Sequence, residues 1–241
     1  MHYATSRQVW NALLPVPQTG SHVSAMRRSW LMQGGGIIGM TDPSGTNVQH
    51  IGTFWILELD KPLPPAIVPR VPATFMRIGP EVAGELVQAI GLDDPAIILQ
   101  RFATGRHCYA ARVDGKLAAY GWVTFDEEAI GELGLRFRLK AGEAYIWDCA
   151  TLAAYRSQGL YSALLAYIVS ELRTAGLCRV WIGADMDNLV SQKGMALAGF
   201  QPAIDFFMDS AHRISQPRLS GRPGISEQLV MDVWRALLGD W

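Results

Sequence analysis

A short turn with an arginine and a glycine lies between a predicted strand and a predicted helix. It spans residues 155–161 (YRSQGLY), after a strand-like run over 144–151 and before an apolar-periodic helix over 158–175. The free N–H groups at a helix start carry partial positive charge, so such a turn binds an anionic group, most often a phosphate. Gly159 lets a ligand approach the backbone closely, and Arg156 adds a fixed positive charge.

Two carboxylates accompany the strand before this turn. Glu143 precedes the run, and Asp148 lies within it. A carboxylate inside an apolar strand is costly unless it is paired or functional. Either group could act as a general base. The alternatives are a solvated Glu143 at the strand end and a structurally hydrogen-bonded Asp148.

Residues 144–202 resemble the GNAT acyltransferases, which move an acetyl group from acetyl-CoA to an amine. The pyrophosphate turn of this family, Arg/Gln-x-x-Gly-x-Gly/Ala, is matched by Arg156, Gly159 and Tyr161, with Tyr161 in place of the usual small residue. The next helix of the family, Asn-x-x-Ala/Ser through Gly-Phe, is matched within residues 188–200. The order and spacing of these parts make the resemblance specific.

The resemblance implies where acetyl-CoA, the expected co-substrate, would bind. In the family, the pantetheine arm pairs with the open edge of the strand before the turn, which is β-augmentation by a ligand. The implied cofactor-binding residues are Cys149, Ala150, Thr151, Arg156, Ser157, Gln158, Gly159, Leu160, Tyr161, Ser162, Asn188 and Ser191, and the implied catalytic residues are Glu143 and Asp148. A plain helix cap at Asn188 and a surface serine at Ser191 are the alternatives for those two positions.

One catalytic position departs from the family. Many GNAT enzymes place a Tyr four residues before the Gly-Phe pair, where this chain has Met195. Tyr161, Tyr145 or water would then protonate the leaving thiolate, or the thiolate leaves unassisted, because a thiol pKa of about 8.5 makes it a tolerable leaving group. Cys149 has no histidine near it in sequence, which favours a structural cysteine over an acyl-cysteine route.

The resemblance implies an α/β (α+β) fold of the GNAT type, with a mixed central sheet flanked by helices. A looser match extends back to about residue 71, so we expect the acetyltransferase domain over residues 71–210. Within it, Asp114-Gly115 predicts a two-residue hairpin. Residues 126–133 are expected to form a loop or a short turn. Residues 136–139 form either an edge strand or part of that loop.

The two ends of the chain lie outside this match. Residues 1–70 are expected to form an N-terminal β-rich extension, with an antiparallel hairpin around the turn signal at 42–45 and a proline-rich linker over 61–72. The extension could add strands to the sheet edge, cover the acceptor site or form a homodimer contact. Residues 211–241 are a tail ending in an amphipathic helix that Ser226 caps, and its apolar face needs either the protein body or another subunit as its partner.

The composition narrows the classes of function. With 49% hydrophobic and 18% charged residues among 241, the chain is typical of a globular protein, and its net charge of −1 implies no general attraction to nucleic acid or to an anionic membrane. Three widely spaced cysteines argue against a disulfide framework or a zinc site and favour a cytoplasmic location without a metal. We find neither a signal peptide nor an apolar run long enough to span a bilayer.

Together these features predict an N-acetyltransferase. It would move an acetyl group from acetyl-CoA to a primary amine of a small molecule or peptide, by direct attack with a general base. One alternative is a non-catalytic acyl-CoA-binding or interaction module of the same fold. The other is a transferase for a longer acyl group, in which Met195 leaves room near the thioester.

Overall fold

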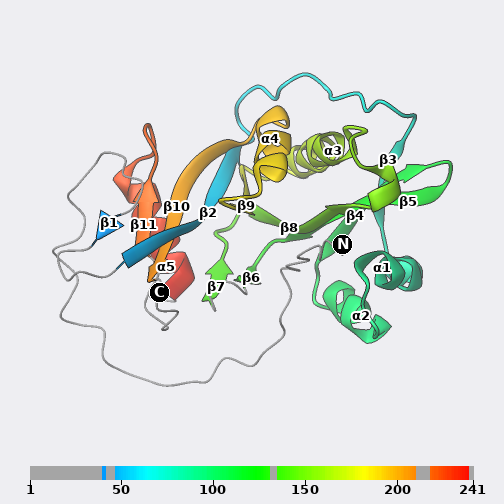
Figure 1. Ribbon diagram of the computed structural model, residues 1–241, viewed down its shortest axis with the longest axis horizontal. Coiled ribbons are helices and arrows are strands. Elements are labelled where there is room, and N and C mark those ends of the chain that lie inside the picture. Colours follow the sequence, from blue (N-terminus) through cyan, green and yellow to red (C-terminus); the bar gives the residue numbers. More distant parts are fainter. Residues whose placement is uncertain (1–39, 42–46, 131–134, 210–217, 239–241) are drawn as a thin grey trace, which may run out of the picture.

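A nine-stranded sheet with helices on both faces forms the body of the structure (Figure 1). The structure is a computed structural model and describes residues 40–41, 47–130, 135–209 and 218–238. Its elements, in chain order, are β1 (Met40–Thr41), β2 (Asn47–Glu58), β3 (Thr74–Ile78), η1 (Pro80–Val82), α1 (Ala83–Ile90), α2 (Pro95–Ala103), β4 (His107–Val113), β5 (Lys116–Thr124), β6 (Glu127–Ile130), β7 (Leu135–Arg138), β8 (Glu143–Thr151), η3 (Ala153–Tyr155), α3 (Leu160–Thr174), β9 (Arg179–Asp185), α4 (Leu189–Leu197), β10 (Gln201–Asp209), β11 (Arg218–Gly221) and α5 (Glu227–Leu238). The predicted mixed sheet flanked by helices is confirmed.

The strand order is β11-β10-β2-β9-β8-β5-β4-β3, and β1 pairs with β2. Each of these pairs is antiparallel except β8 and β9, which are parallel. A parallel pair needs a crossover connection, and α3 provides it over one face of the sheet. The pairing joins residues 143–146 to residues 179–182 and stops there, although both strands continue. Beyond these four pairs, β8 and β9 part.

β2 comes from the chain segment before residue 70, and it is an inner strand of the sheet. It pairs with β9 on one side and with β10 on the other. Phe54 and Ile56 join the apolar cluster that contains α5, whereas Trp55 joins the cluster that contains α3. This segment therefore adds a strand inside the sheet, not at its edge. Where the acetyltransferase domain begins stays a prediction.

The predicted hairpin in the N-terminal region is present in part. Met40 and Thr41 pair antiparallel with Val48 and Asn47. The turn at residues 42–46 and the first part of the extension lie outside the described residues. The hairpin predicted at Asp114-Gly115 joins β4 to β5, and both of its turn residues have positive φ, as the sequence pair predicts.

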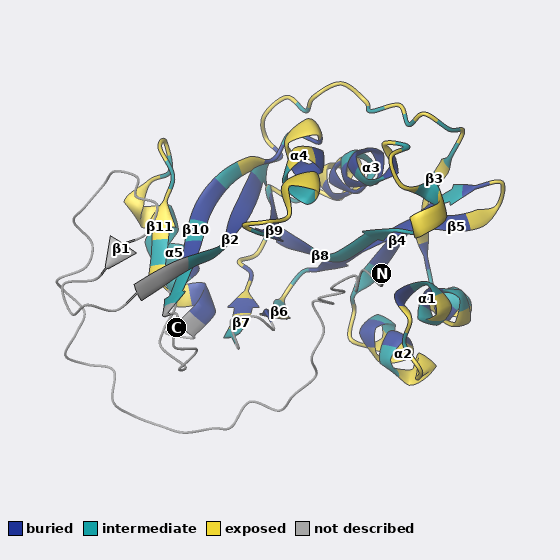
Figure 2. Ribbon diagram, viewed as in Figure 1, coloured by how far each residue is buried: buried dark blue, intermediate teal, exposed yellow. Residues whose placement is uncertain are grey.

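The helices divide between the two faces of the sheet. In Figure 1, α3 and α4 lie on one side of the sheet, and α1 and α2 lie on the other. The predicted stripe of α3 is buried along its whole length, which Figure 2 shows as a dark blue face (Leu160, Leu164, Leu165, Ile168, Val169 and Leu172). This burial fixes the position of the α3 N-terminus relative to β8.

The expected loop over residues 126–133 is wrong for its first part. Residues 127–130 form β6, which pairs antiparallel with β7, so the segment left open at 136–139 is mostly a strand. Ile130 and Phe137 are fully buried, and the exposed face holds ion pairs from the two β7 arginines to Glu127. The consecutive charges Glu127 and Glu128 made this strand look like a polar loop, although Glu128 is buried in an ion pair with Arg106.

The C-terminal helix packs on the protein body. Val233, Ala236 and Leu237 of α5 are buried in the same cluster as Phe54. The backbone N–H of Leu229 donates to Ser226 Oγ at 3.2 Å, which confirms the predicted cap. Among the described residues, none of the helices is both long and apolar enough to cross a bilayer.

Replacing Phe54 by Ala tests the inner position of β2. Phe54 is 2% exposed, and its ring packs against Phe137, Tyr145 and Phe206. We expect Phe54→Ala to lower the free energy of unfolding by about 3–5 kcal/mol in a urea titration, because the removed ring leaves a cavity. Val68→Ala is the control, since Val68 is 86% exposed. A loss below about 1 kcal/mol for Phe54→Ala would contradict this placement of β2.

Candidate functional site

A cavity of about 290 Å³ opens where β8 and β9 part. It extends from the end of α1, along one edge of β8, to the start of α4. Of the residues predicted for the site, it brings together Asp148, Cys149, Ala150, Thr151, Arg156, Tyr161, Asn188 and Ser191. Six predicted residues are not part of its lining: Glu143, Ser157, Gln158, Gly159, Leu160 and Ser162. Five of these six belong to the turn and the first turn of α3, beside the cavity.

The second half of β8 has one edge without a neighbouring strand. On its other edge β8 pairs with β5 as far as Thr151, but its pairing with β9 ends at Ile146. Two side-chain atoms on this stretch, Trp147 Nε1 and Thr151 Oγ1, are buried and have no hydrogen-bond partner within the described residues. Buried polar atoms are normally paired. The edge over residues 147–151 therefore offers polar groups to a bound ligand.

A bulge at Asp148 changes the direction of the side chains along β8. Asp148 has φ +43°, and the pairing register with β5 shifts at this point, opposite Gly121. Ile146 and Cys149 belong to the apolar cluster that contains α3, so two residues between them, Trp147 and Asp148, point to the opposite face. A Cβ on Gly121 would lie 2.7 Å from Cys149 Sγ, so glycine is required opposite the bulge.

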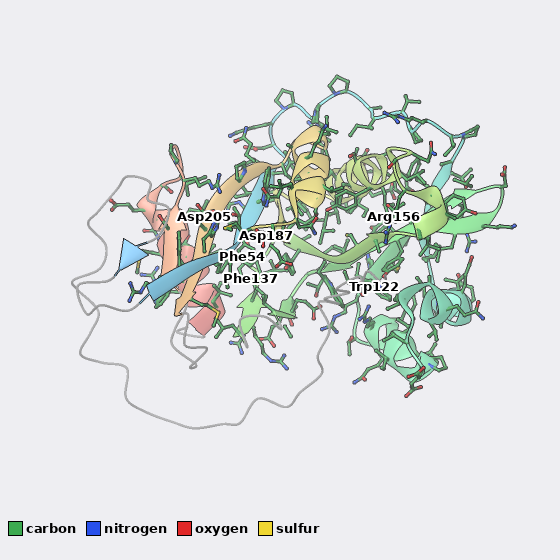
Figure 3. The ribbon with its side chains drawn as sticks, viewed as in Figure 1. Phe54, Trp122, Phe137, Arg156, Asp187 and Asp205 are labelled. Atoms are coloured by element: carbon green, nitrogen blue, oxygen red, sulfur yellow. The ribbon has the colours of Figure 1, made fainter. Side chains whose placement is uncertain are left out.

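The Asp148 carboxylate is paired with a buried arginine from α2. Arg101 Nη1 lies 2.5 Å from Asp148 Oδ2, and the two side chains are 8% and 9% exposed. The Arg101 guanidinium lies 4.7 Å from the ring centre of Trp147 and 5.2 Å from that of Trp122. Desolvated cation–π contacts contribute on the order of 2 kcal/mol each. Figure 3 labels Trp122 on the side of the sheet that faces α1 and α2.

Tyr120 is a second neighbour of Asp148. Its hydroxyl lies 3.5 Å from Asp148 Oδ1, at the outer limit of a hydrogen bond. Burial, and then the charge of Asp148, raise the pKa of the Tyr120 phenol well above its usual range. The phenol therefore stays protonated at neutral pH, and its O–H can donate a hydrogen bond to the carboxylate.

The Glu143 carboxylate lies outside the cavity and is held by three donors. Arg179 Nη1 donates to it at 2.9 Å, Trp181 Nε1 at 3.2 Å and the Lys140 backbone N–H at 3.3 Å. Glu143 sits opposite Arg179 in the closed part of the β8–β9 pair. It lies five positions before Asp148, which corresponds to about 16 Å along a strand. Its catalytic role stays a prediction without support from its position.

The turn after β8 has the geometry of an anion site. Ser157 and Gly159 have φ of +63° and +77°, a backbone conformation in which successive N–H groups form a concave surface. The first N–H groups of α3 have no acceptor within the helix. The Arg156 side chain is exposed and lines the cavity, and Figure 3 shows it near the end of β8.

The proline-rich linker supports this turn from its carbonyl side. The Arg70 backbone N–H donates to the Gln158 carbonyl at 2.8 Å, and Arg70 Nη1 donates to the Ser157 carbonyl at 3.3 Å. Figure 1 shows the connection between β2 and β3 passing over α4 and α3. The predicted linker thus holds the turn while leaving its N–H groups to other partners.

Tyr161 reaches from α3 to α4 across the cavity wall. Its hydroxyl lies 2.8 Å from Ser191 Oγ, and burial raises the pKa of its phenol well above the usual range. The ring packs so closely on Gly194 that a Cβ there would lie 2.4 Å from it. Met195, by contrast, is buried in the core and does not line the cavity.

Asn188 and Ser191 occupy the start of α4. The Ser191 backbone N–H donates to Asn188 Oδ1 at 3.1 Å, so Asn188 is a helix N-cap. Both residues also line the cavity. The cap therefore does not exclude contact with a ligand.

The cysteines carry no reactive thiolate in this site. Cys108, Cys149 and Cys178 are unpaired. Burial, and then the Asp148 charge, raise the pKa of the Cys149 thiol well above its usual range. The structural interpretation of Cys149 is therefore favoured over nucleophilic catalysis. Within the described part of the chain, no group of acidic, histidine and cysteine side chains could hold a metal ion.

Sequence reasoning missed several residues of the cavity and its surroundings. Tyr120, Trp147 and Asp185 line it, as do Ala89 and Ile90 at the end of α1. The cost of burying Asp148 signalled that it needs a partner. This cost did not indicate that the partner is Arg101, which lies 47 residues away in sequence.

The family model described as the acetyltransferase (GNAT) family matches residues 83–200. This range contains all the residues predicted for the site. No curated protein matches the chain.

Three solved structures are similar to parts of this chain. A GNAT-family acetyltransferase from Colwellia psychrerythraea is 17% identical, aligns over 65% of this chain and 54% of that one, and has a TM-score of 0.47. A putative GNAT-family acetyltransferase from Novosphingobium aromaticivorans is 21% identical, over 70% and 67%, with a TM-score of 0.45. An aminoglycoside acetyltransferase from an uncultured soil metagenomic sample is 14% identical, over 53% and 87%, with a TM-score of 0.43. The chain spans about half the length of the first.

Two glycine-to-alanine changes within helices test the packing at the cavity wall. We expect Gly194→Ala to lower the free energy of unfolding by about 1–3 kcal/mol, because the added methyl displaces the Tyr161 ring. Gly84→Ala in α1 is the matched control, since nothing lies within 4 Å of its Cβ position, and it should be neutral or stabilising by up to about 1 kcal/mol. Equal effects of the two changes in a urea titration would contradict the Tyr161 contact.

Proposed function

Residues 83–200 form a GNAT acetyltransferase domain, and from this we propose that the protein transfers an acetyl group from acetyl-CoA to a primary amine of a small molecule or peptide. The observation that carries the proposal is the continuity of the site. One cavity is lined by Arg156 at the anion-binding turn, by the open edge of β8 and by Asp148. A long ligand with an anionic end and a reactive end fits this order of groups.

The turn and the open strand edge are the parts that would hold acetyl-CoA. The N–H groups of residues 157–162 and the Arg156 guanidinium suit its pyrophosphate. The edge over residues 147–151 suits the amides of its pantetheine arm, and the unpaired Thr151 Oγ1 supplies a further polar contact there. Acetyl-CoA supplies an activated acetyl thioester when bound. Asn188 and Ser191 lie across the cavity from this edge and are proposed as additional contacts.

At the far end of the cavity, Asp148 is the carboxylate that we propose faces the acceptor. It is part of the cavity lining, whereas Glu143 lies outside it with three donors of its own. A carboxylate here attracts the acceptor as an ammonium and can accept the proton that must leave before the amine attacks.

Tyr161 is the group that we propose protonates or hydrogen-bonds the leaving thiolate. It lines the cavity, its phenol keeps its proton because burial raises the pKa, and Ser191 orients its hydroxyl. Tyr145 also lines the cavity, but it packs in the aromatic cluster around Phe54. Met195 is buried and offers no proton.

A non-catalytic acyl-CoA-binding module remains the second candidate. One observation favours it: the charge of Asp148 is already matched by Arg101 at 2.5 Å. Such a module would bind acetyl-CoA as tightly as an enzyme but acetylate no amine. The cytoplasmic location, the acyl chain length and a homodimer are also proposals at this point.

Replacing Arg156 by Ala tests the anion-binding turn. We expect the dissociation constant for acetyl-CoA, measured by calorimetry, to rise at least about tenfold, because one charge-assisted hydrogen bond contributes about 1.5–3 kcal/mol. Desulfo-CoA should show the same loss, since the change is remote from the thioester. Arg173→Ala, at the other end of α3 and exposed, is the control. Equal affinities for the two variants would argue against a phosphate site at this turn.

Replacing Asp148 by Asn tests catalysis separately from binding. Acetylation is measured by thiol release with a panel of a polyamine, an amino sugar and a peptide. We expect kcat/KM to fall about 100-fold or more, because a general base is lost, while acetyl-CoA affinity stays within about threefold. Glu143→Gln should instead lower stability through its buried ion pair and leave kcat/KM within about tenfold. Acetyl-CoA binding without acetylation of any amine by the wild type would favour the binding module.

A further inference from the structure

Arg101 of α2 is a buried charge beside the cavity. Its side chain is 8% exposed, and its guanidinium is enclosed by Trp122 and Trp147. Removing a guanidinium from water is costly, and a well-packed apolar side chain could fill the same space without that cost. Stability alone therefore does not account for an arginine at this position.

The surroundings of Arg101 fix both the place and the plane of its guanidinium. The ring centres of Trp147 and Trp122 lie 4.7 and 5.2 Å away, and Phe102, the next residue in α2, packs on Trp122 at 4.8 Å. A planar guanidinium stacks on aromatic faces and donates in fixed directions, which an ammonium cannot do. The donor that reaches Asp148 Oδ2 at 2.5 Å is therefore held in position before any ligand binds.

Asp148 itself needs such support from outside its own strand. It has φ +43° at the bulge of β8, a conformation that is uncommon outside glycine, although Asp adopts it more readily than most residues. Its pairing strand β9 has already parted from β8 at this point. The Tyr120 hydroxyl at 3.5 Å is too distant to orient a carboxylate strongly.

We propose that Arg101 is a positioning residue for the acceptor end of the site: it holds the bulge at Asp148 and fixes the orientation of the Asp148 carboxylate toward the amine. The proposal rests on the proposed function, because that function assigns the acceptor to Asp148. It assigns to α2 a role in amine recognition, although no residue of α2 lines the cavity.

A second arginine–carboxylate pair nearby provides a matched comparison. Arg106 Nε lies 2.6 Å from Glu128, whose side chain is 7% exposed, and the Arg106 guanidinium lies 5.8 Å from the ring centre of Trp147. The two pairs share one indole and have similarly buried carboxylates, whereas the Arg106 side chain is 22% exposed and that of Arg101 is 8% exposed. Glu128 does not line the cavity. Replacing Arg106 therefore removes a partly buried ion pair that has no contact with the site.

A double-mutant cycle on the full-length protein tests the proposal. The proteins are the wild type, Arg101→Gln, Asp148→Asn and the double variant, with Arg106→Gln as the structural control. The measured quantities are kcat/KM for spermidine and for benzylamine, the acetyl-CoA dissociation constant, and amide hydrogen exchange over residues 147–151. Benzylamine is included because Tyr120 and Trp147 give the cavity an aromatic lining. Arg101→Lys is added because it keeps the charge and loses the planar fork.

The proposal predicts a specific pattern across this cycle. Arg101→Gln should lower kcat/KM about tenfold or more in the wild-type background but less than threefold in the Asp148→Asn background, because residues that act as a unit are not additive. Arg101→Lys should recover little of the loss. Exchange over residues 147–151 should be faster in Arg101→Gln than in Arg106→Gln, and acetyl-CoA affinity should change less than threefold in both.

Three outcomes would overturn the proposal. They are an unchanged kcat/KM in Arg101→Gln, an equal loss in both backgrounds of the cycle, and an equal loss in Arg106→Gln. If Arg101→Gln does not fold, Arg101→Lys carries the same comparison. A failure of the proposed function is distinguishable, because the wild type itself would then acetylate neither amine, while the exchange comparison would still report whether Arg101 holds the bulge.

Discussion

The parting of β8 from β9 is the constraint on which the rest of the site depends. Two parallel strands pair over four residues and then separate, which leaves the edge at residues 147–151 without a strand partner. An unpaired edge is usually a liability, because it can pair with another chain. Here the end of α1 and the start of α4 enclose it in a cavity. The same separation brings the helix start at residue 160 beside the end of that edge, so that an anion site and an open strand adjoin.

The bulge at Asp148 brings a carboxylate to the lining of this cavity. It places Trp147 and Asp148 on one face, opposite the face that packs on α3. The ion pair with Arg101 offsets the cost of burying the Asp148 charge. The two indoles that flank Arg101 offset the cost of burying its guanidinium. A group of residues that costs more to bury than an apolar core is best explained by what its carboxylate does in the cavity.

The parts of the fold that local sequence determines were predictable. The helix caps at Asn188 and Ser226, the hairpin at Asp114-Gly115 and the apolar stripe of α3 follow from residue types at fixed spacing, and the structure confirms them. The strand β6 was missed, because Glu128 on its buried face is charged and its partner Arg106 is distant in sequence. The inner position of β2 was also missed, because strand order depends on contacts between distant segments that no local pattern contains.

Some parts of the candidate site were also predictable from local sequence, and other parts were not. The turn at residues 155–161 and the open edge of β8 follow from motif order. The distinction between Glu143 and Asp148 does not, because both carboxylates belong to one strand and differ only in whether β9 is still paired beside them. The partner of Asp148 could not be predicted from the sequence either, because Arg101 belongs to a helix 47 residues earlier in the chain.

A crystal structure with acetyl-CoA bound tests the central claim most directly. The account predicts that the pantetheine amides pair with the backbone of residues 147–151, that the pyrophosphate contacts the N–H groups of residues 157–162, and that the thioester lies near Asp148. A structure in which acetyl-CoA binds elsewhere, or in which the 147–151 edge makes no contact with it, would contradict the account.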